Sequence, residues 1–299
     1  MKILNNIIRY MFAIAIMALP ASCDDDAHKD ERGVAIALSW QDEADQGTAI
    51  NDILLWIYKE DGEAVGEYRY GNAKEIASTL YELEAGDYVL IAGVNLVSPF
   101  SVGQAVADGM KTYEELVFLL DDAGASPPHA HYGVTAIHVQ GSGVERACVS
   151  LRRVLAELTV TIEDAPTGAS LSVSVTDAAD GIRPARKDSD GGYGSAAGGA
   201  DTVFLPEAAE QEGRIATGTV RLMPTVPDSD RSHLHFLLTL ADVGIREFDA
   251  DAPVMKPSGK YELTLKYGDM KPYMRLSAAD INDWTEGWTI DGEILNPEN

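Results

Sequence analysis

The sequence predicts an all-β protein of two β-sandwich domains in tandem, with one short helix in the first. From Val34 onward, apolar residues mostly alternate with polar or small ones, the two-residue period of a half-buried strand. Gly, Asp and Asn turn signals separate many short strands, which favours sandwiches over an α/β fold. The span 34–299 holds about 265 residues, which suits two domains of ordinary size.

The first domain is expected over residues 34–153. Its strongest strand signals are residues 34–38, 53–58, 88–94, 132–139 and 145–151. The run 53–58 is apolar almost throughout, as in a buried strand, and it ends at the turn Asp61-Gly62. Cys148 lies in an apolar segment and is expected to be a small core residue.

The helix is expected to begin at Thr112. Glu115 follows three residues later, which makes a capping box. An apolar stripe follows at helical spacing, formed by Tyr113, Leu116, Leu119 and Leu120. We expect this stripe to cover a sheet rather than to bind a partner.

The second domain is expected over residues 154–299, with the boundary near Arg152–Val154. Strand signals fall at residues 154–162, 171–175, 219–223, 233–240 and 261–267. In the first of these the apolar residues share one face. Residues 183–201 contain almost no large apolar side chain and are predicted to form a long loop or a flexible hairpin.

Residues 1–22 have the pattern of a secretory signal. Lys2 and Arg9 precede an apolar run over residues 11–19, and small residues precede Cys23. The run is about half the length needed to span a bilayer. A cysteine at this place indicates a lipoprotein signal, in which the thiol of Cys23 takes a lipid and becomes the new N-terminus. The alternative is an ordinary signal peptide with an incidental cysteine.

Residues 23–33 are short, polar and charged, and are predicted to form a lipidated tether. Asp24, Asp25 and Asp26 resemble the surface-export signal of Bacteroidota lipoproteins. The resemblance implies display on the outer membrane surface; a plain solvated linker facing the periplasm is the alternative. Thr202, in Asp201-Thr202-Val203, matches a short O-glycosylation pattern of exported proteins.

Composition excludes several classes of protein. The formal net charge of −25 repels nucleic acid, so no nucleic-acid partner is expected. Two cysteines are too few for a disulfide framework. No HExxH, GxSxG or Walker motif occurs, so neither an enzyme nor a cofactor is expected.

Two histidine pairs are candidate metal ligands, His129 with His131 and His233 with His235. The second pair shares one face of a strand and could hold a metal ion. The sequence supplies no third ligand, so we predict surface histidines and no metal site.

Several segments together resemble the fimbrillin superfamily, above all its FimB-type fimbrillin-associated anchor lipoproteins. They are the start at residues 23–26, the strand and turn 53–62, and the segments 83–95, 151–160 and 281–288. The resemblance implies two transthyretin-like sandwiches and a role in surface fimbriae, with fimbrial stalk or accessory subunits and the outer membrane as partners.

The resemblance also implies assembly by strand exchange, in which main-chain pairing adds a donated strand to a sheet edge. We expect residues 34–38 to fill the groove of their own domain. The candidate exchange segment carries Ile281, Trp284, Trp288 and Ile290. The alternative function is a surface adhesin that binds a glycan or a host protein through Trp284 or Trp288.

In polymerising members of the superfamily that the chain resembles, an arginine-specific protease removes the first strand. Arg32 and Arg69 are the arginines available in this region. A cut at either would separate the protein from its lipid unless the strand stayed bound. We therefore predict an intact, lipidated chain.

Overall fold

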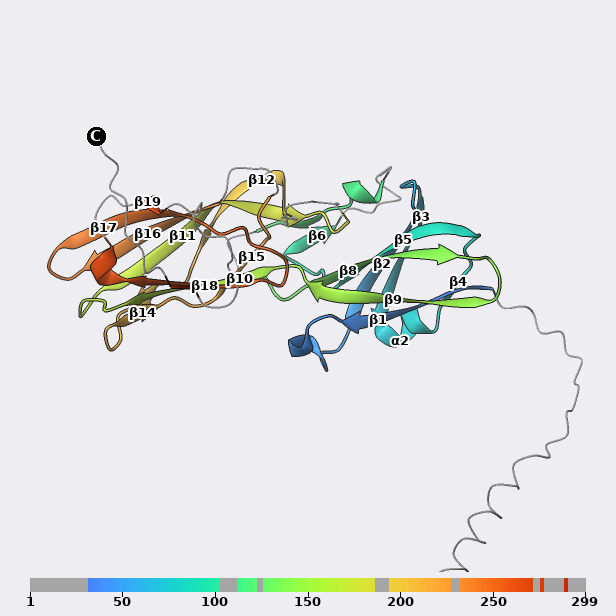
Figure 1. The fold of residues 1–299 in the computed structure, drawn as a ribbon, viewed down its shortest axis with the longest axis horizontal. Coiled ribbons are helices and arrows are strands. Elements are labelled where there is room, and N and C mark those ends of the chain that lie inside the picture. The colour runs from blue at the N-terminus through green and yellow to red at the C-terminus, as the bar shows by residue number, and fades with distance from the viewer. Residues whose placement is uncertain are drawn as a thin grey trace, which may run out of the picture. The chain divides into compact units, whose positions relative to one another are not determined.

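The computed structural model describes residues 32–102, 112–122, 126–185, 194–226, 232–270, 275–276 and 288–289. These residues are mostly β-strand, as predicted (Figure 1). Contacts join residues Arg32–Asn299 into one unit. Among the described residues, no helix has the length and apolar character needed to cross a membrane.

The first sandwich has seven strands in two sheets. They are β1 (Gly33–Trp40), β2 (Asn51–Lys59), β3 (Ala64–Asn72), β4 (Leu80–Tyr81), β5 (Gly86–Val94), β8 (His131–Val139) and β9 (Val144–Arg153). One sheet has the order β4-β1-β9 and the other β3-β2-β5-β8. A two-residue pairing of β8 with β9 joins the sheets at one edge.

The second sandwich repeats this topology. Its strands are β10 (Ala156–Glu163), β11 (Ser170–Ile182), β12 (Gly194–Phe204), β13 (Ala208–Ala209), β14 (Arg214–Ala216), β15 (Val220–Leu222), β16 (His233–Leu240), β17 (Gly244–Asp251) and β18 (Lys260–Lys266). β10 pairs with β14, β15 and β18, as β1 pairs with β4 and β9. The order β12-β11-β16-β17 matches β3-β2-β5-β8.

The apolar alternation that predicted the strands matches their burial. Along β10 the apolar side chains facing the core, Ala156, Leu158, Val160 and Ile162, are fully buried. β11 and β12 pair antiparallel, so residues 194–201 form a strand, as the predicted hairpin requires; residues 186–193 lie outside the described residues. Cys148 departs from the prediction because it is exposed. Its neighbours Ala147 and Val149 face the core, so strand alternation turns the thiol outward.

β2 is buried on both faces, as its apolar run predicted. Ile53, Leu55 and Ile57 pack between the two sheets of the first sandwich. Trp56 and Tyr58 point to the other face, where the connection from β5 to β8 covers them. This connection contains β6 (Phe100–Val102), the short 3₁₀ helix η2 (Tyr113–Glu115) and β7 (Phe118–Leu120).

The prediction of a helix beginning at Thr112 was wrong. Only one 3₁₀ turn forms, and the Thr112 side chain makes no capping hydrogen bond. Residues 118–120 form β7 instead. Phe118 and Leu120 both face the core, and side chains two residues apart share a face in a strand but not in a helix. The segment nevertheless covers a sheet, as expected, because Phe118 packs on Trp56 of β2 with ring centroids 5.7 Å apart.

The short helix of the first sandwich is instead α2 (Ala73–Ala77). Its N-cap is Asn72, whose side-chain oxygen accepts hydrogen bonds from the backbone N–H groups of Lys74 and Glu75. Ile76 is fully buried and fixes the helix on the core of the first sandwich.

Candidate functional site

Most of the residues predicted to act lie outside the described residues. These are Cys23, Asp24, Asp25, Asp26, Ile281, Trp284 and Ile290. Trp288 begins β20 (Trp288–Thr289), which pairs in parallel with β18 at Leu263 and Thr264. Thr202 is exposed on β12.

β1 lies in a slot between β9 and β4. All eight of its residues pair in parallel with β9, the last strand of the sandwich. Val34 and Ile36 are each 1% exposed in the core between the sheets. Gly33 enters the slot with a φ of +144°, and a Cβ there would lie 2.6 Å from the carbonyl oxygen of Tyr81. The first strand is therefore a core element of this sandwich.

The outer strands of the second sandwich take short segments from the end of the chain. β19 (Arg275–Leu276) pairs in parallel with β17, and β20 pairs with β18. In the first sandwich the equivalent strands β8 and β9 pair with each other instead. In the described part of the chain, β20 covers only two of the seven residues of β18. The edge of β18 thus accepts an extended segment, as its parallel pairing with β20 shows.

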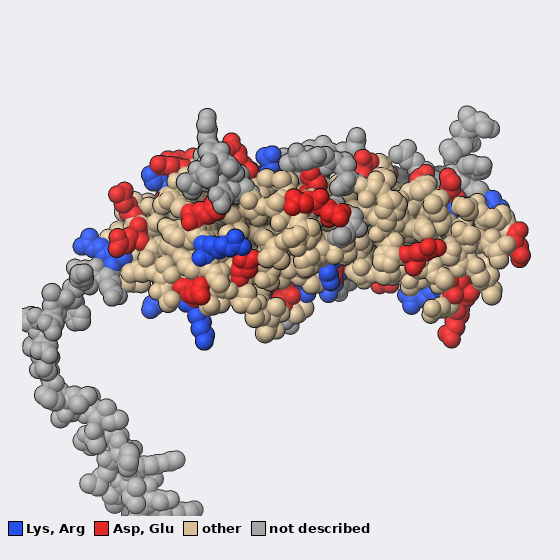
Figure 2. All heavy atoms as spheres, turned by 180° about the vertical axis from the view of Figure 1, so that it is seen from behind, with Lys and Arg blue, Asp and Glu red and all other residues tan. Residues whose placement is uncertain are grey.

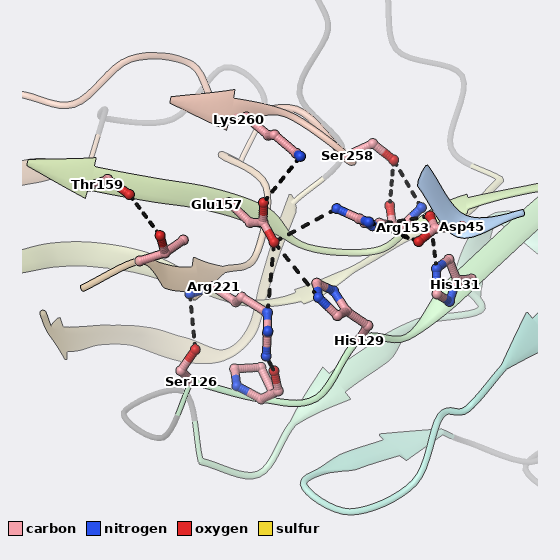
Figure 3. Close-up of polar contacts among 12 residues, drawn as sticks. Asp45, Ser126, His129, His131, Arg153, Glu157, Thr159, Arg221, Ser258 and Lys260 are labelled. Atoms are coloured by element: carbon pink, nitrogen blue, oxygen red, sulfur yellow. Dashed lines mark hydrogen bonds and ion pairs between the residues drawn. The ribbon is translucent and has the colours of Figure 1, made fainter. Parts of the chain in front are cut away.

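A polar cluster lies where the two sandwiches meet (Figure 3). We call it the junction cluster; its members are Asp45, His129, His131, Arg153, Glu157, Arg221, Ser258 and Lys260. At its centre, the Arg153 guanidinium donates from Nη2 to Oδ1 of Asp45 at 2.8 Å and from Nε to both carboxylate oxygens at 3.1 and 3.2 Å. The two side chains are 12% and 10% exposed, so the ion pair is largely desolvated.

Local structure holds Asp45 in place. It ends the 3₁₀ turn η1 (Glu43–Asp45), between β1 and β2, and its carbonyl oxygen accepts a hydrogen bond from the N–H of Thr48. The indole N–H of Trp40 donates to the carbonyl of Thr48 at 3.2 Å. The ring of His131 stacks edge-on against Trp40 at 4.6 Å and lies 3.3 Å from the Asp45 carboxylate.

Glu157, on β10, is the acidic centre of the other half of the cluster. Four side chains approach its carboxylate: His129 and Arg153 at 3.8 Å, and Arg221 and Lys260 at 3.9 Å. At these separations the attraction is Coulombic rather than hydrogen-bonded.

Backbone groups also join the two sandwiches. The N–H of Arg153 donates to the Ser258 hydroxyl at 2.9 Å, across the junction. Arg221, on β15, donates from its guanidinium to the carbonyl of Pro127 at 2.9 Å. In addition, β7 pairs with β11 at Gly181 and Ile182, so the β5–β8 connection extends a sheet of the second sandwich. Side-chain, backbone and strand contacts therefore all cross the junction.

The cluster shifts the pKa values of its members. Burial lowers the pKa of the His131 imidazole, and the nearby Asp45 carboxylate offsets this only in part. Burial raises the pKa of Asp45, but hydrogen bonds and charge from Arg153, with a contribution from His131, outweigh it and lower the pKa overall. The pKa of His129 is also lowered, by burial and by the charges of Arg221 and Arg153.

We predict that acid weakens the protein below about pH 6.5. The unfolded chain takes up a proton on His131 near the ordinary pKa of 6.5, whereas the folded chain resists it. The free energy of unfolding is therefore at its full value above that pH and falls as the pH drops below it. Urea midpoints at pH 7.5 and pH 5.5 check this, and His131→Gln is expected to reduce the difference. The exposed His138→Gln is the control; an equal reduction there would contradict the assignment.

In the described part of the chain, no group of three or more His, Cys, Asp or Glu side chains could hold a metal ion. Figure 2 shows acidic and basic side chains interspersed over one face, without a basic patch on that face. His233 and His235 are partly exposed on β16, as predicted, and each contacts an aspartate of β17.

The junction cluster could not be found from the sequence. Asp45 and Arg153 are 108 positions apart, and only the parallel pairing of β1 with β9 brings the two segments together. Local patterns give no signal of this pairing. The one available hint was the predicted domain boundary itself, which placed Arg153 at the end of the first domain.

Comparison with known proteins gives one family. The model of the family "Fimbrillin-A associated anchor proteins Mfa1 and Mfa2" matches residues 21–289. No curated protein matches the chain.

Several solved structures have a similar fold. A candidate adhesin from Bacteroides thetaiotaomicron is 12% identical, with a TM-score of 0.53 over 81% of this chain and 94% of that one. A candidate cell adhesion protein from Parabacteroides distasonis is 11% identical, with a TM-score of 0.51 over 83% and 90%. The fimbrial anchor protein Mfa2 from Porphyromonas gingivalis is 12% identical, with a TM-score of 0.49 over 68% and 76%.

Proposed function

Because the chain belongs to the family of fimbrillin-A associated anchor proteins Mfa1 and Mfa2, we propose that it is the anchor or accessory subunit of a fimbria. In this proposal the lipid on Cys23 holds it in the outer membrane, facing outward. Its sandwiches join fimbrial subunits by strand exchange. The protein is structural, and no step of the proposal needs catalysis.

The placement of β1 is the observation that carries this proposal. The groove of the first sandwich is filled by the chain's own strand, which directly follows the tether of residues 23–33. A force applied to the lipid would reach the core through a strand paired along its whole length. A subunit built this way can end a fimbria at the membrane, because its own groove is not available to a neighbour's strand.

The second sandwich supplies the proposed point of attachment. The outer edge of β18 is covered at only two residues by β20 in the described part of the chain. A strand from a fimbrial subunit could pair along the rest of this edge, with Lys260–Lys266 as the template. The segment that carries Trp288 would then be displaced or donated in exchange.

The test of this proposal is recovery of the native protein from cell envelopes under mild detergent. Co-purification of a fimbrial stalk subunit, identified by mass spectrometry, supports the anchor function. If the wild-type protein repeatedly brings down no fimbrial subunit, the proposal fails.

The second candidate function is a surface adhesin. It is favoured by the likeness in fold to candidate adhesion proteins of Bacteroides and Parabacteroides, at 11–12% identity. A glycan array probed with the mature protein and with a Trp284→Ala, Trp288→Ala variant separates the two functions. Binding to a glycan that is lost in the variant, without association with fimbriae, would favour the adhesin.

We also predict that the functional protein keeps its N-terminal strand. Mass spectrometry of the surface protein is expected to find a chain that begins at lipidated Cys23. A cut after Arg32 would leave β1 but remove the tether, and a cut after Arg69 would remove β1 and β2 entire. A stable form that begins at Gly33 or Tyr70 would indicate a polymerising subunit instead.

A further inference from the structure

β3 is an edge strand of the first sandwich. In the described part of the chain its only strand partner is β2, which lies on one side of it. A free edge presents unpaired main-chain groups, and proteins commonly protect it with proline or lysine. β3 reads AVGEYRYGN and contains neither, and its bulge, opposite Ile57 and Tyr58, affects only the beginning of the strand. Among the described residues, no other strand pairs with the rest of this edge.

The hydrogen bonding of β2 shows which main-chain groups of β3 face the free edge. The N–H of Asn95 donates to the carbonyl of Asp52, so the even-numbered residues of β2 bond to β5. Bonding alternates along an antiparallel strand, so the odd-numbered residues of β2 bond to β3. Tyr68 lies opposite an odd-numbered residue of β2. Its neighbours Glu67 and Arg69 therefore turn their N–H and C=O groups to the free edge.

We propose that this edge pairs with the same edge of a second copy of the chain, antiparallel and about a two-fold axis at Tyr68. In this register Glu67 of each copy lies opposite Arg69 of the other. Each such pair exchanges two main-chain hydrogen bonds, so the two-fold symmetry supplies about four. The dimer then contains one continuous sheet that runs through the first sandwich of both copies.

The charges select this register. Because the residues that bond across the edge alternate, successive registers of the two copies differ by two residues. A shift in one direction places Glu67 opposite Glu67, and a shift in the other direction places Arg69 opposite Arg69. Like charges directly opposite each other destabilise a strand pair, and opposite charges stabilise it. Of these three registers, only the proposed one has opposite charges in both pairs.

The neighbouring side chains fit the same register. Tyr70 of one copy lies opposite Gly66 of the other, so the large ring meets no side chain across the edge. Val65, an apolar residue that is 39% exposed, lies opposite Gly71 in the same way. The N–H of Gly71 donates to the Glu75 carboxylate at 2.7 Å, so we expect the new pairing to end before this residue.

The two charged side chains are available to a second copy. Among the described residues, Glu67 forms no ion pair. Arg69 is 67% exposed and donates to Asp52 from Nε and Nη2, at 3.2 and 2.8 Å. A guanidinium carries five N–H donors, so the others remain for the Glu67 carboxylate of the second copy.

The experiment is sedimentation equilibrium of the mature protein, prepared without lipid, over a range of protein concentrations. Salt at about 0.15 M screens the repulsion between copies of net charge −25 beyond about 8 Å. The contact is small, so we expect a weak and reversible equilibrium between monomer and dimer. Glu67→Arg and Arg69→Glu are each expected to weaken the dimer at least tenfold, because each creates two pairs of like charge.

The double variant makes the test specific. Glu67→Arg combined with Arg69→Glu restores opposite charges in both pairs and is expected to recover the dimer. Glu247→Arg makes the same change of charge at an exposed position on β17 and should leave the dimer unchanged. Urea midpoints check that each variant is folded.

A disulfide tests the position of the two-fold axis. In the proposed register the two Tyr68 residues form a pair without main-chain hydrogen bonds, with Cα atoms about 4.5 Å apart, which suits a disulfide. In a Cys148→Ser background, Tyr68→Cys is expected to form a covalent dimer under mild oxidation. Val65→Cys, three residues from the axis, is the control and should not.

Several results would overturn the proposal. They are a monomer at every concentration, a dimer that neither single charge reversal weakens, and a double variant that does not recover the dimer. Covalent dimers that form as readily through Val65→Cys as through Tyr68→Cys would also contradict it. A monomer would leave the β3 edge to a strand of a different protein.

Discussion

Replacement of Arg153 by leucine is expected to lower the free energy of unfolding by about 3–5 kcal/mol, the usual cost of removing one partner from a buried ion pair. The Asp45 carboxylate, which is 10% exposed, would lose every hydrogen bond that the guanidinium donates to it. Glu157 would also lose one of its three cationic neighbours, which are Arg153, Arg221 and Lys260. Urea unfolding followed by tryptophan fluorescence measures the loss.

The chain provides a matched control for this experiment. Arg69 forms the same kind of arginine–aspartate ion pair with Asp52, at 2.8 Å, but its side chain is 67% exposed. Arg69→Leu is therefore expected to cost less than about 1 kcal/mol. Asp45→Asn added to Arg153→Leu should recover part of the loss, because it removes the unpaired charge. Equal losses for the two arginine variants would show that the junction pair is not desolvated in solution.

Ile36→Ala, on β1, is expected to cost about 2–5 kcal/mol, the range for truncating a buried isoleucine to alanine. Ile36 is 1% exposed in the core of the first sandwich, and the parallel pairing with β9 fixes it there. Chemical denaturation measures the change. The loss would establish that the first strand contributes to the core while it remains attached to the tether.

Ala37 is the control on the same strand. It is exposed, since it lies on the other face of β1, and Ala37→Ser is expected to change stability by less than about 0.5 kcal/mol. If Ile36→Ala were as mild as Ala37→Ser, β1 would not fill its own groove in solution. The groove would then be free to accept a strand from another subunit, which is the behaviour of a polymerising fimbrillin.

The strands that were predicted from the sequence have buried side chains on at least one face. β1, β10 and β16 show a clean alternation because every second side chain enters a core. β3 and β17 were not predicted, because they lack such a regularly buried face. β3 is an edge strand without a fully buried side chain, and much of β17 is polar and exposed, so neither shows a sustained apolar period.

The features of the fold and of the site that were not predicted depend on pairings between segments far apart in the sequence. The stripe at residues 113–120 has apolar spacing that suits a helix, but β7 pairs with β11 about 60 residues later, and this pairing decides its conformation. The junction cluster likewise arises from the parallel pairing of β1 with β9. The repeated topology of the two sandwiches left no signal, because equivalent strands share only a pattern of apolar positions.

The central claim is that a lipid on Cys23 links the membrane to a fimbria through the paired sandwiches, and Cys23→Ala tests it most directly. The variant cannot be acylated at this position, while β1 and both cores are untouched. We expect a folded protein with unchanged urea midpoint that leaves the envelope fraction and appears in the medium, together with shed fimbriae. A Cys148→Ala control should stay in the envelope. If the Cys23→Ala protein remained in the outer membrane with fimbriae attached, the proposed anchoring would be wrong.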